Sequence, residues 1–279
     1  MLRISEPGRG LCPGRHWAYR RLTSIARNQR SANRVSEAAS TRKPLYRAFI
    51  KRPLDVVFSA LALFILSPVL GAIALLVRLR LGSPVLFLQL RPGRKDAAGR
   101  ETLFTICKFR SMTDKRDENG KLLCDEARLT RLGRFLRKTS LDELPELWNI
   151  LKGDMSVIGP RPQLVRDMVF MTQEQRKRHD VRPGLSGLAQ INGRNDIQWE
   201  DKLEYDLRYV RRMTFVEDFR IFLVTIGKVF KAESVTFEDM ATAEDFGDYL
   251  RRSGKITDAE YRLRQQEALT ILKENTDAV

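Results

Sequence analysis

The residues in this sequence best suited to chemistry are two adjacent carboxylates, Asp142 and Glu143, in the segment TSLDELPEL. Neighbouring side chains on a helix point about 100° apart, so the two carboxylates can take separate roles. One would serve as a nucleophile and metal ligand, while the other would handle a proton. The pair is therefore a candidate catalytic site.

A structural alternative exists for the same segment. Ser140 and Glu143 have the spacing of an S-x-x-E capping box, and acidic residues are favoured in the first turn of a helix. Pro145 weakens this alternative, because as the fifth helical residue it would lack the N–H that bonds the carbonyl of Leu141. The local pattern leaves both interpretations open.

Cations recur along the segment that follows the first apolar run. Each alone is more often a solvated surface charge than a ligand, but three occupy constrained contexts: Arg161 lies between two prolines, Arg182 precedes Pro-Gly, and Arg194 follows a glycine. Glycine-containing loops expose backbone N–H groups to phosphate oxygens, and arginine makes bidentate contacts with them. These features predict a diphosphate site, with candidates at Lys108, Arg110, Arg134, Arg137, Arg161, Arg182 and Arg194.

Other chemistries find little support. The sequence lacks a G-x-x-x-x-G-K-[ST] phosphate loop, H-E-x-x-H and G-x-S-x-G. Its two histidines, His16 and His179, have no catalytic context. The three cysteines lack metal-ligand spacing, and an odd, scattered set favours a reducing compartment.

An apolar segment of 22 residues, Val56 to Val77, must position these groups relative to a membrane. As a continuous helix it would be about 33 Å long, against a hydrocarbon core of about 30 Å. Ser67-Pro68 interrupts it, and two cations flank each end. The positive-inside rule favours the cytoplasm for both clusters, so we predict a re-entrant helix-break-helix anchor.

Two alternatives compete with the re-entrant anchor. A proline-kinked single span is tolerated in membranes, because Ser67 and neighbouring groups can satisfy the freed carbonyl. A buried core helix is disfavoured, since the segment has no polar stripe.

Charge indicates the class of partner. The 279-residue chain carries a net charge of +15, which points to nucleic acid, anionic lipid or phosphorylated substrates. Residues 1–46 contribute ten cations and two acids. Their composition superficially suits a transit peptide, but we predict a disordered arm attracted to anionic lipid.

We predict a mostly helical α/β protein with four parts. They are a basic arm (1–46), the anchor (47–81), a compact catalytic domain (82–232), whose extent is what the resemblance described below implies, and a helical extension (233–279). The predicted strands are 85–90 and 103–109, and the predicted loops are 114–125, 153–162 and 182–194. The predicted helices are 126–138, 141–151 and 163–178, followed by an amphipathic stretch at 199–232 and a hairpin at 246–272. The amphipathic stretch lies either in a membrane interface or packed on the domain.

Four successive blocks carry a resemblance that the local patterns alone do not. In order and spacing, these blocks resemble the bacterial sugar transferases, which are monotopic phosphoglycosyl transferases. The blocks are KRPLDVVFSALALFILSPVL, KFRSM, SLDELPELWNILKGDMSVIGPRP and RPGLSGLAQINGR. The resemblance implies a monotopic enzyme on the cytoplasmic face of the bacterial inner membrane. Such an enzyme moves a sugar-1-phosphate from a UDP-sugar to a polyprenyl phosphate, usually undecaprenyl phosphate. UMP leaves, and the product starts a glycan.

The resemblance also implies residue roles. Asp142 matches the nucleophile and Mg²⁺ contact, and Glu143 its partner carboxylate, which would assist the lipid phosphate. The expected reaction is a two-step displacement through a covalent phosphosugar–aspartyl intermediate. The implied substrate and phosphate residues are Arg137, Arg182 and the supporting Arg161, followed by the weaker assignments Lys108, Arg110, Gln190 and Arg194.

The two ends of the chain lie outside the resemblance, and two other functions compete with the one that it implies. The basic arm is not part of the family pattern, and the C-terminal hairpin is either a homo-oligomerisation module or a surface helix pair. A membrane-tethered nucleic-acid-binding protein would need interleaved aromatic residues or a recognised fold, and the sequence has neither, so we expect no nucleic-acid partner. A non-catalytic scaffold with the same fold is disfavoured by the intact Asp142-Glu143 pair.

Overall fold

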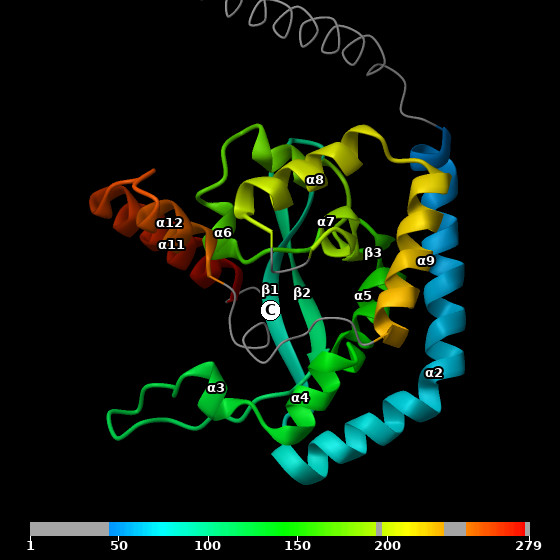
Figure 1. The fold of residues 1–279 in the computed structure, drawn as a ribbon, viewed down its shortest axis with the longest axis horizontal. Helices are drawn as coiled ribbons and strands as arrows, with labels where there is room; N and C mark the ends of the chain where they lie inside the picture. Colours follow the sequence, from blue (N-terminus) through cyan, green and yellow to red (C-terminus); the bar gives the residue numbers. More distant parts are fainter. Residues whose placement is uncertain (1–44, 194–196, 232–243, 277–279) are drawn as a thin grey trace, which may run out of the picture. The chain divides into compact units, whose positions relative to one another are not determined.

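A computed structural model describes residues 45–193, 197–231 and 244–276 (Figure 1). The predicted basic arm and Arg194 therefore lie outside the described residues, apart from the last residues of the arm. The described part is mostly helical with little sheet, as predicted. Its elements are η1 (Tyr46–Ile50), α2 (Lys51–Leu81), β1 (Leu86–Lys95), β2 (Glu101–Phe109), α3 (Asp125–Arg128), α4 (Arg131–Lys138), η2 (Leu141–Glu143), α5 (Glu146–Lys152), β3 (Ser156–Ile158), α6 (Val165–Met168), η3 (Gln175–Asp180), β4 (Gly184–Ser186), α7 (Leu188–Ile191), α8 (Trp199–Arg211), α9 (Phe215–Lys231), α11 (Phe246–Arg252) and α12 (Asp258–Thr276).

Helix α2 begins the described chain and, with η1, is the one helix of the described residues that is long and apolar enough to cross a membrane. Its 31 residues correspond to about 46 Å. Figure 1 shows α2 changing direction partway along, and Pro68 lies inside the helix. The hydroxyl of Ser67 donates to the carbonyl of Phe64 at 2.8 Å, and this is the carbonyl that loses its partner because Pro68 has no N–H. The predicted break is thus a bend within one helix.

The first half of α2 is tied to the rest of the protein by buried polar side chains. Lys51 Nζ lies 2.5 Å from Asp218 Oδ2 of α9, and Tyr209 donates to the other Asp218 oxygen at 2.7 Å. One turn further along α2, Asp55 Oδ1 accepts from the backbone N–H of Val157 in β3 at 3.0 Å. These contacts fix the orientation of the helix against β3 and α9.

The second half of α2 packs through apolar side chains. Ile73 and Val77 are 5% and 0% exposed and form a cluster with Phe109 of β2 and Leu136 of α4. Both halves of the bent helix therefore contact the same body of the protein.

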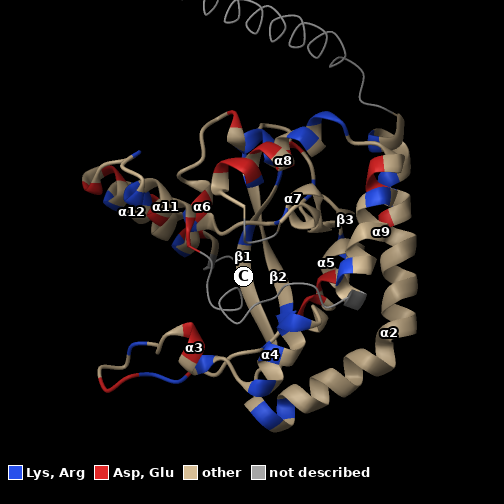
Figure 2. Cartoon of the chain, in the orientation of Figure 1, with Lys and Arg blue, Asp and Glu red and all other residues tan. Residues whose placement is uncertain are grey.

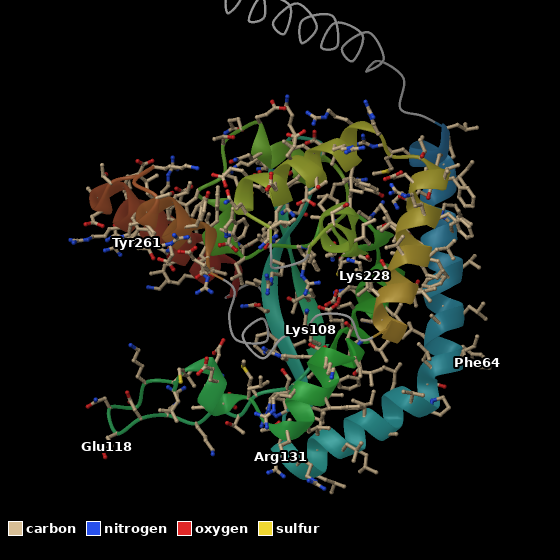
Figure 3. The ribbon with its side chains drawn as sticks, viewed as in Figure 1. Phe64, Lys108, Glu118, Arg131, Lys228 and Tyr261 are labelled. Carbon is tan, nitrogen blue, oxygen red and sulfur yellow. The ribbon has the colours of Figure 1, made fainter. Side chains whose placement is uncertain are left out.

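The remaining surface of α2 is apolar and exposed. Figure 2 shows a long uncharged stretch of α2 with basic residues near its two ends, and Figure 3 shows Phe64 pointing away from the other elements. Phe64 is 80% exposed. Helix α9 adds a second exposed apolar surface. The exposed apolar residues include Val57, Leu61, Phe64, Ile65, Leu75, Leu76 and Leu79 on α2, and Phe215, Val216, Phe219 and Leu223 on α9.

Two small sheets organise the interior. Strands β1 and β2 pair antiparallel, with an irregularity in the register between Pro92 and Lys95. Strands β3 and β4 pair parallel, so the segments predicted as loops at 153–162 and 182–194 each contain a short strand. The predictions missed them because each strand is three residues long and both lie among glycines and prolines.

The pairing of β3 with β4 requires glycine where the two segments approach each other most closely. A Cβ on Gly184 would lie 2.0 Å from the backbone nitrogen of Gly159, and one on Gly159 would lie 2.6 Å from the carbonyl oxygen of Arg182. Gly184 N–H donates to the carbonyl of Pro160 at 2.9 Å. These two glycines serve backbone packing between the two segments.

Several predicted helices are shorter or divided. The stretch 126–138 is two helices, because Thr130 caps α4 by accepting from the N–H of Gly133 at 3.0 Å. The stretch 141–151 is the 3-10 turn η2 followed by α5, with Pro145 as the residue before α5. Only α6 and η3 form within and around 163–178. The stretch 199–232 divides into α8 and α9, and the C-terminal hairpin forms as α11 and α12.

Candidate active site

The turn η2 presents the two predicted carboxylates. Ser140, just before it, is left-handed with φ 56° and makes no side-chain cap bond, so the capping-box alternative is wrong. A non-glycine residue in this conformation costs about 1–3 kcal/mol and persists only where the surroundings enforce it. Glu143 N–H donates to the carbonyl of Ser140 at 3.2 Å, which closes the turn.

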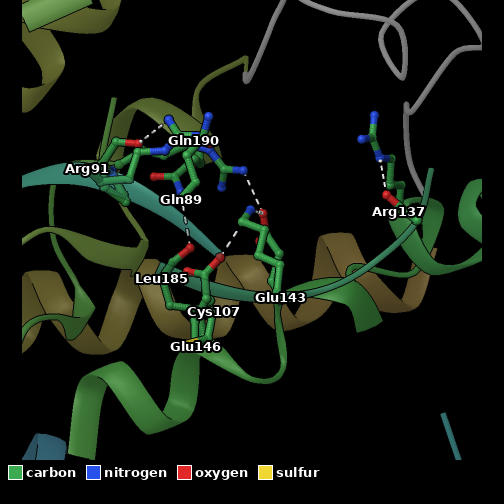
Figure 4. Close-up of polar contacts among 12 residues, drawn as sticks. Gln89, Arg91, Cys107, Arg137, Glu143, Glu146, Leu185 and Gln190 are labelled. Atoms are coloured by element: carbon green, nitrogen blue, oxygen red, sulfur yellow. Dashed lines mark hydrogen bonds and ion pairs between the residues drawn. The ribbon is translucent and has the colours of Figure 1, made fainter. Parts of the chain in front are cut away.

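Two cations from other elements converge on Glu143 (Figure 4). Its Oε1 lies 2.8 Å from Lys108 Nζ of β2 and 2.6 Å from a guanidinium nitrogen of Arg161, which follows β3. Burial alone would raise the pKa of Glu143, but Arg161 and Lys108 together hold that pKa well below its usual range. Glu143 is therefore a permanent anion that holds two cations in place and is a weak proton acceptor.

A third carboxylate, Glu146, joins the cluster from the first turn of α5. It is 2% exposed, and its Oε1 lies 3.1 Å from Lys108 Nζ. Burial raises the pKa of Glu146 to about 7. The sequence analysis missed this residue, although its signal was available: Glu146 is three residues after Glu143, the spacing that places two side chains on one helical face.

Asp142 is 8% exposed and lies beside Glu143 in the same turn. Burial and the neighbouring charge of Glu143 raise the pKa of Asp142, while Lys108, Arg137 and Arg161 act in the opposite direction. A cation bound beside Asp142 would favour its charged, nucleophilic form.

A cleft of about 1240 Å³ opens in front of this cluster. It exceeds the size of a phosphate group and suits a larger ligand with an anionic centre. Of the residues predicted for the site, it is lined by Lys108, Arg110, Arg137, Asp142, Glu143, Arg161 and Gln190.

The predicted cations differ in how they are held. Arg137 Nε donates to Ser111 Oγ at 3.0 Å, apart from the Glu143 cluster in Figure 4. Arg110 donates to the carbonyls of Leu81 and Ser83, at 3.0 Å for the latter, so it also joins the end of α2 to β2.

The structure places two further predicted residues, Gln190 and Arg182, differently with respect to the cleft. Gln190 Nε2 donates to the carbonyl of Leu185 at 3.2 Å, and its Oε1 has no hydrogen-bond partner among the described residues. Arg182 Nε donates to the carbonyl of Gly153 at 2.7 Å, and Arg182 is not among the residues that line the cleft.

Two arginines that the sequence analysis did not single out support the site. Arg91 of β1 lines the cleft and donates to the carbonyl of Pro162 at 3.2 Å. Burial, followed by the charge of Arg161, lowers the pKa of Arg91 to about 10. Arg178, ion-paired with Asp206 at 2.7 Å, donates to the carbonyl of Arg161 at 2.6 Å. The only sequence signal for Arg91 is a cation directly after an apolar strand.

The donor set suits a metal that relies on its substrate for ligands. Among the residues that the structure describes, no group of three or more His, Cys, Asp or Glu side chains is placed to hold a metal ion. Mg²⁺ is commonly held by one or two carboxylates together with substrate phosphates and water. Asp142, beside a Glu143 carboxylate that pairs with two cations, fits that donor set.

Comparison with known proteins gives the family. The sequence profile of the family described as "Bacterial sugar transferase" matches residues 46–232. An uncharacterized sugar transferase of Bacillus subtilis, EpsL, is 46% identical over 197 residues, which cover 71% of this chain and 95% of that protein.

Larger relatives match over the same region. The UDP-N-acetylgalactosamine-undecaprenyl-phosphate N-acetylgalactosaminephosphotransferase of Aeromonas hydrophila is 39% identical over 67% of this chain and 44% of its own length. The UDP-glucose:undecaprenyl-phosphate glucose-1-phosphate transferase of Escherichia coli is 39% identical over 65% of this chain and 40% of its own length. This chain thus spans less than half of these two relatives. Because the matched region includes α2 and every described residue of the carboxylate and cation cluster, the chain belongs to the bacterial sugar transferase family.

Proposed function

We propose that this protein transfers a sugar-1-phosphate from a UDP-sugar to a polyprenyl phosphate, releasing UMP, as the first membrane step in the synthesis of a glycan. The observation that carries the proposal is the buried Asp142 beside the Lys108–Glu143–Arg161 cluster in a cleft of about 1240 Å³. The names of the Aeromonas and Escherichia relatives, which specify UDP-sugar and undecaprenyl phosphate, support the choice of substrates.

The reaction takes place in two displacements. A carboxylate oxygen of Asp142 attacks the phosphorus that is bonded to the sugar, and the bond from that phosphorus to the bridging oxygen breaks, so that UMP leaves with the electron pair. An oxygen of the polyprenyl phosphate then attacks the phosphorus of the aspartyl phosphosugar. The bond to Asp142 breaks, which regenerates its carboxylate and gives a polyprenyl diphosphate sugar.

The cations make this attack feasible. A carboxylate and a diphosphate repel each other, and Lys108 and Arg161, which line the cleft, offset part of that repulsion. Mg²⁺, held by Asp142 and the substrate phosphates, would supply the remaining charge neutralisation. Glu143 keeps the two cations aimed at the phosphates, and its low pKa favours this positioning role over proton transfer.

The contacts of α2 support a re-entrant anchor. Its first half, through the buried Lys51 and Asp55, and its second half, through Ile73 and Val77, pack on the same body, which favours a helix that returns to the side from which it entered. The exposed apolar residues of α2 and α9 would enter one leaflet, and the basic ends of α2 would stay at the cytoplasmic surface. The cleft then meets a lipid phosphate from the membrane and a nucleotide sugar from the cytoplasm.

The direct test is UMP release by the purified protein in lipid particles, supplied with undecaprenyl phosphate, Mg²⁺ and a panel of UDP-sugars. We expect release with at least one UDP-sugar, loss of release on Mg²⁺ chelation, and loss with Asp142→Asn, because the amide is not a nucleophile. Asp201→Asn, an exposed position on α8, is the matched control and should keep full activity.

The covalent step has its own readout. Incubation with the UDP-sugar in the absence of lipid acceptor should add one phosphosugar to the peptide that contains Asp142, as measured by mass spectrometry. Substantial turnover by Asp142→Asn, or an adduct on a different side chain, contradicts the mechanism. Labelling that finds the two ends of α2 on opposite sides of the bilayer contradicts the re-entrant topology.

A further inference from the structure

The C-terminal hairpin of α11 and α12 is outside the part of the chain that matches the family, which ends at residue 232. It is nevertheless fixed to the core. Ala268 of α12 is 2% exposed and packs with Val165 and Val169, while Phe246 of α11 is 2% exposed and packs with Trp199. The hairpin is therefore part of the folded body that contains the cleft.

One buried carboxylate links the hairpin to the loop that carries a site cation. Asp167 of α6 accepts from the backbone N–H of Phe246 at 2.9 Å through one oxygen, and from that of Leu164 at 3.2 Å through the other. Leu164 is three residues after Arg161, which pairs with Glu143. An ion pair between Arg166 and Asp245, at 2.9 Å, adds to this junction.

Helix α12 also lines the cleft directly. Gln265, Leu269 and Leu272 follow the i, i+4, i+7 spacing of one helical face, and all three line the cleft that contains Asp142. Leu269 lines this cleft and is 58% exposed. The residues that α12 contributes to the wall of this cleft are an amide and apolar side chains, and none of them is charged.

The chemistry of this wall indicates which substrate it meets. Phosphates would be held at the cationic end of the cleft, whereas an amide beside leucines suits an uncharged group that carries hydroxyls or a base. Figure 1 shows α11 and α12 on the far side of β1 and β2 from α2 and α9, the helices with exposed apolar faces. A lipid acceptor would arrive from those helices, so the hairpin is placed for the water-soluble donor.

We propose that the face of α12 formed by Gln265, Leu269 and Leu272 is a wall of the donor site and selects among nucleotide sugars through the uncharged part of the donor. This inference rests on the proposed function. It assigns the hairpin a role in substrate choice that the family match does not cover.

The test compares two leucines of the same helix. Leu269→Trp fills the cleft wall, whereas Leu263→Trp changes a residue that is 65% exposed and does not line the cleft. We expect Leu269→Trp to change the ratio of kcat/KM between UDP-sugars by about tenfold or more, with the KM for undecaprenyl phosphate and the melting temperature unchanged. Leu263→Trp should keep the wild-type ratio. Gln265→Ala, a milder change, should shift the ratio severalfold and remains informative if the tryptophan variant folds poorly.

Equilibrium binding of each UDP-sugar to the same variants separates this inference from the proposed function. If the wild type binds a UDP-sugar but releases no UMP, the proposed function fails, and the binding ratios of the variants then decide the inference. Wild-type ratios in both Leu269→Trp and Gln265→Ala overturn it, as does an equal shift in Leu263→Trp. If no UDP-sugar binds to the wild type, both the proposed function and this inference are overturned.

Discussion

We predict that Glu146 makes a pH-dependent contribution to stability, which the isosteric change Glu146→Gln should remove. Its carboxylate is buried 3.1 Å from Lys108 Nζ, and burial raises its pKa from 4.5 to about 7. A carboxyl whose pKa is higher in the folded state than in the unfolded state holds its proton more tightly when folded. It therefore contributes stability at low pH that is lost as the pH rises from about 4.5 through about 7.

The size of this effect follows from the shift. A difference of one pKa unit corresponds to about 1.4 kcal/mol, so the free energy of unfolding should fall by up to about 3 kcal/mol across this pH range through Glu146 alone. Glu146→Gln keeps the volume and removes the titration. The variant should gain up to about 3 kcal/mol relative to the wild type on going from pH 4.5 to pH 8.

The assay is urea unfolding of the detergent-solubilised protein at several pH values, with wild type and Glu146→Gln measured side by side. Glu118→Gln, in the exposed loop where Figure 3 labels Glu118, is the matched control, because it makes the same side-chain change at the surface. A constant difference between wild type and Glu146→Gln at every pH would refute the assignment of a raised pKa to this carboxyl.

Two further predictions concern packing around the site. Arg178→Met leaves the buried carboxylate of Asp206 without its cation and should cost about 3–5 kcal/mol in urea unfolding; adding Asp206→Leu should restore most of it, and an unaffected single variant would contradict this. Gly133→Ala places a Cβ 1.8 Å from the carbonyl oxygen of Ser111. It should lower the free energy of unfolding by about 1–3 kcal/mol or more, and with it the melting temperature. Gly71→Ala, where no atom lies within 4 Å, should be neutral or stabilising, and equal melting temperatures for the two alanine variants would argue against the close approach.

Local patterns determined much of the fold because some signals need no tertiary information. The apolar run with Pro68 predicted α2, and the apolar runs at 85–90 and 103–109 predicted strands where β1 and β2 form. The periodic C-terminal segment defined α11 and α12. The three-residue strands β3 and β4 were missed, because their pairing depends on the close approach of Gly159 and Gly184, which are distant in sequence.

For the site, the sequence by itself identified the residue types: an Asp142-Glu143 pair among spaced cations, and blocks that resemble one family. Only the tertiary structure decided which groups meet, because Lys108 and Arg161 reach Glu143 from separate elements. It also decided the protonation behaviour of Glu146, since burial is a property of the folded chain. The physical reason is the same in each case. Residue chemistry and helix period are local, whereas desolvation and ion pairing depend on what the rest of the chain brings alongside.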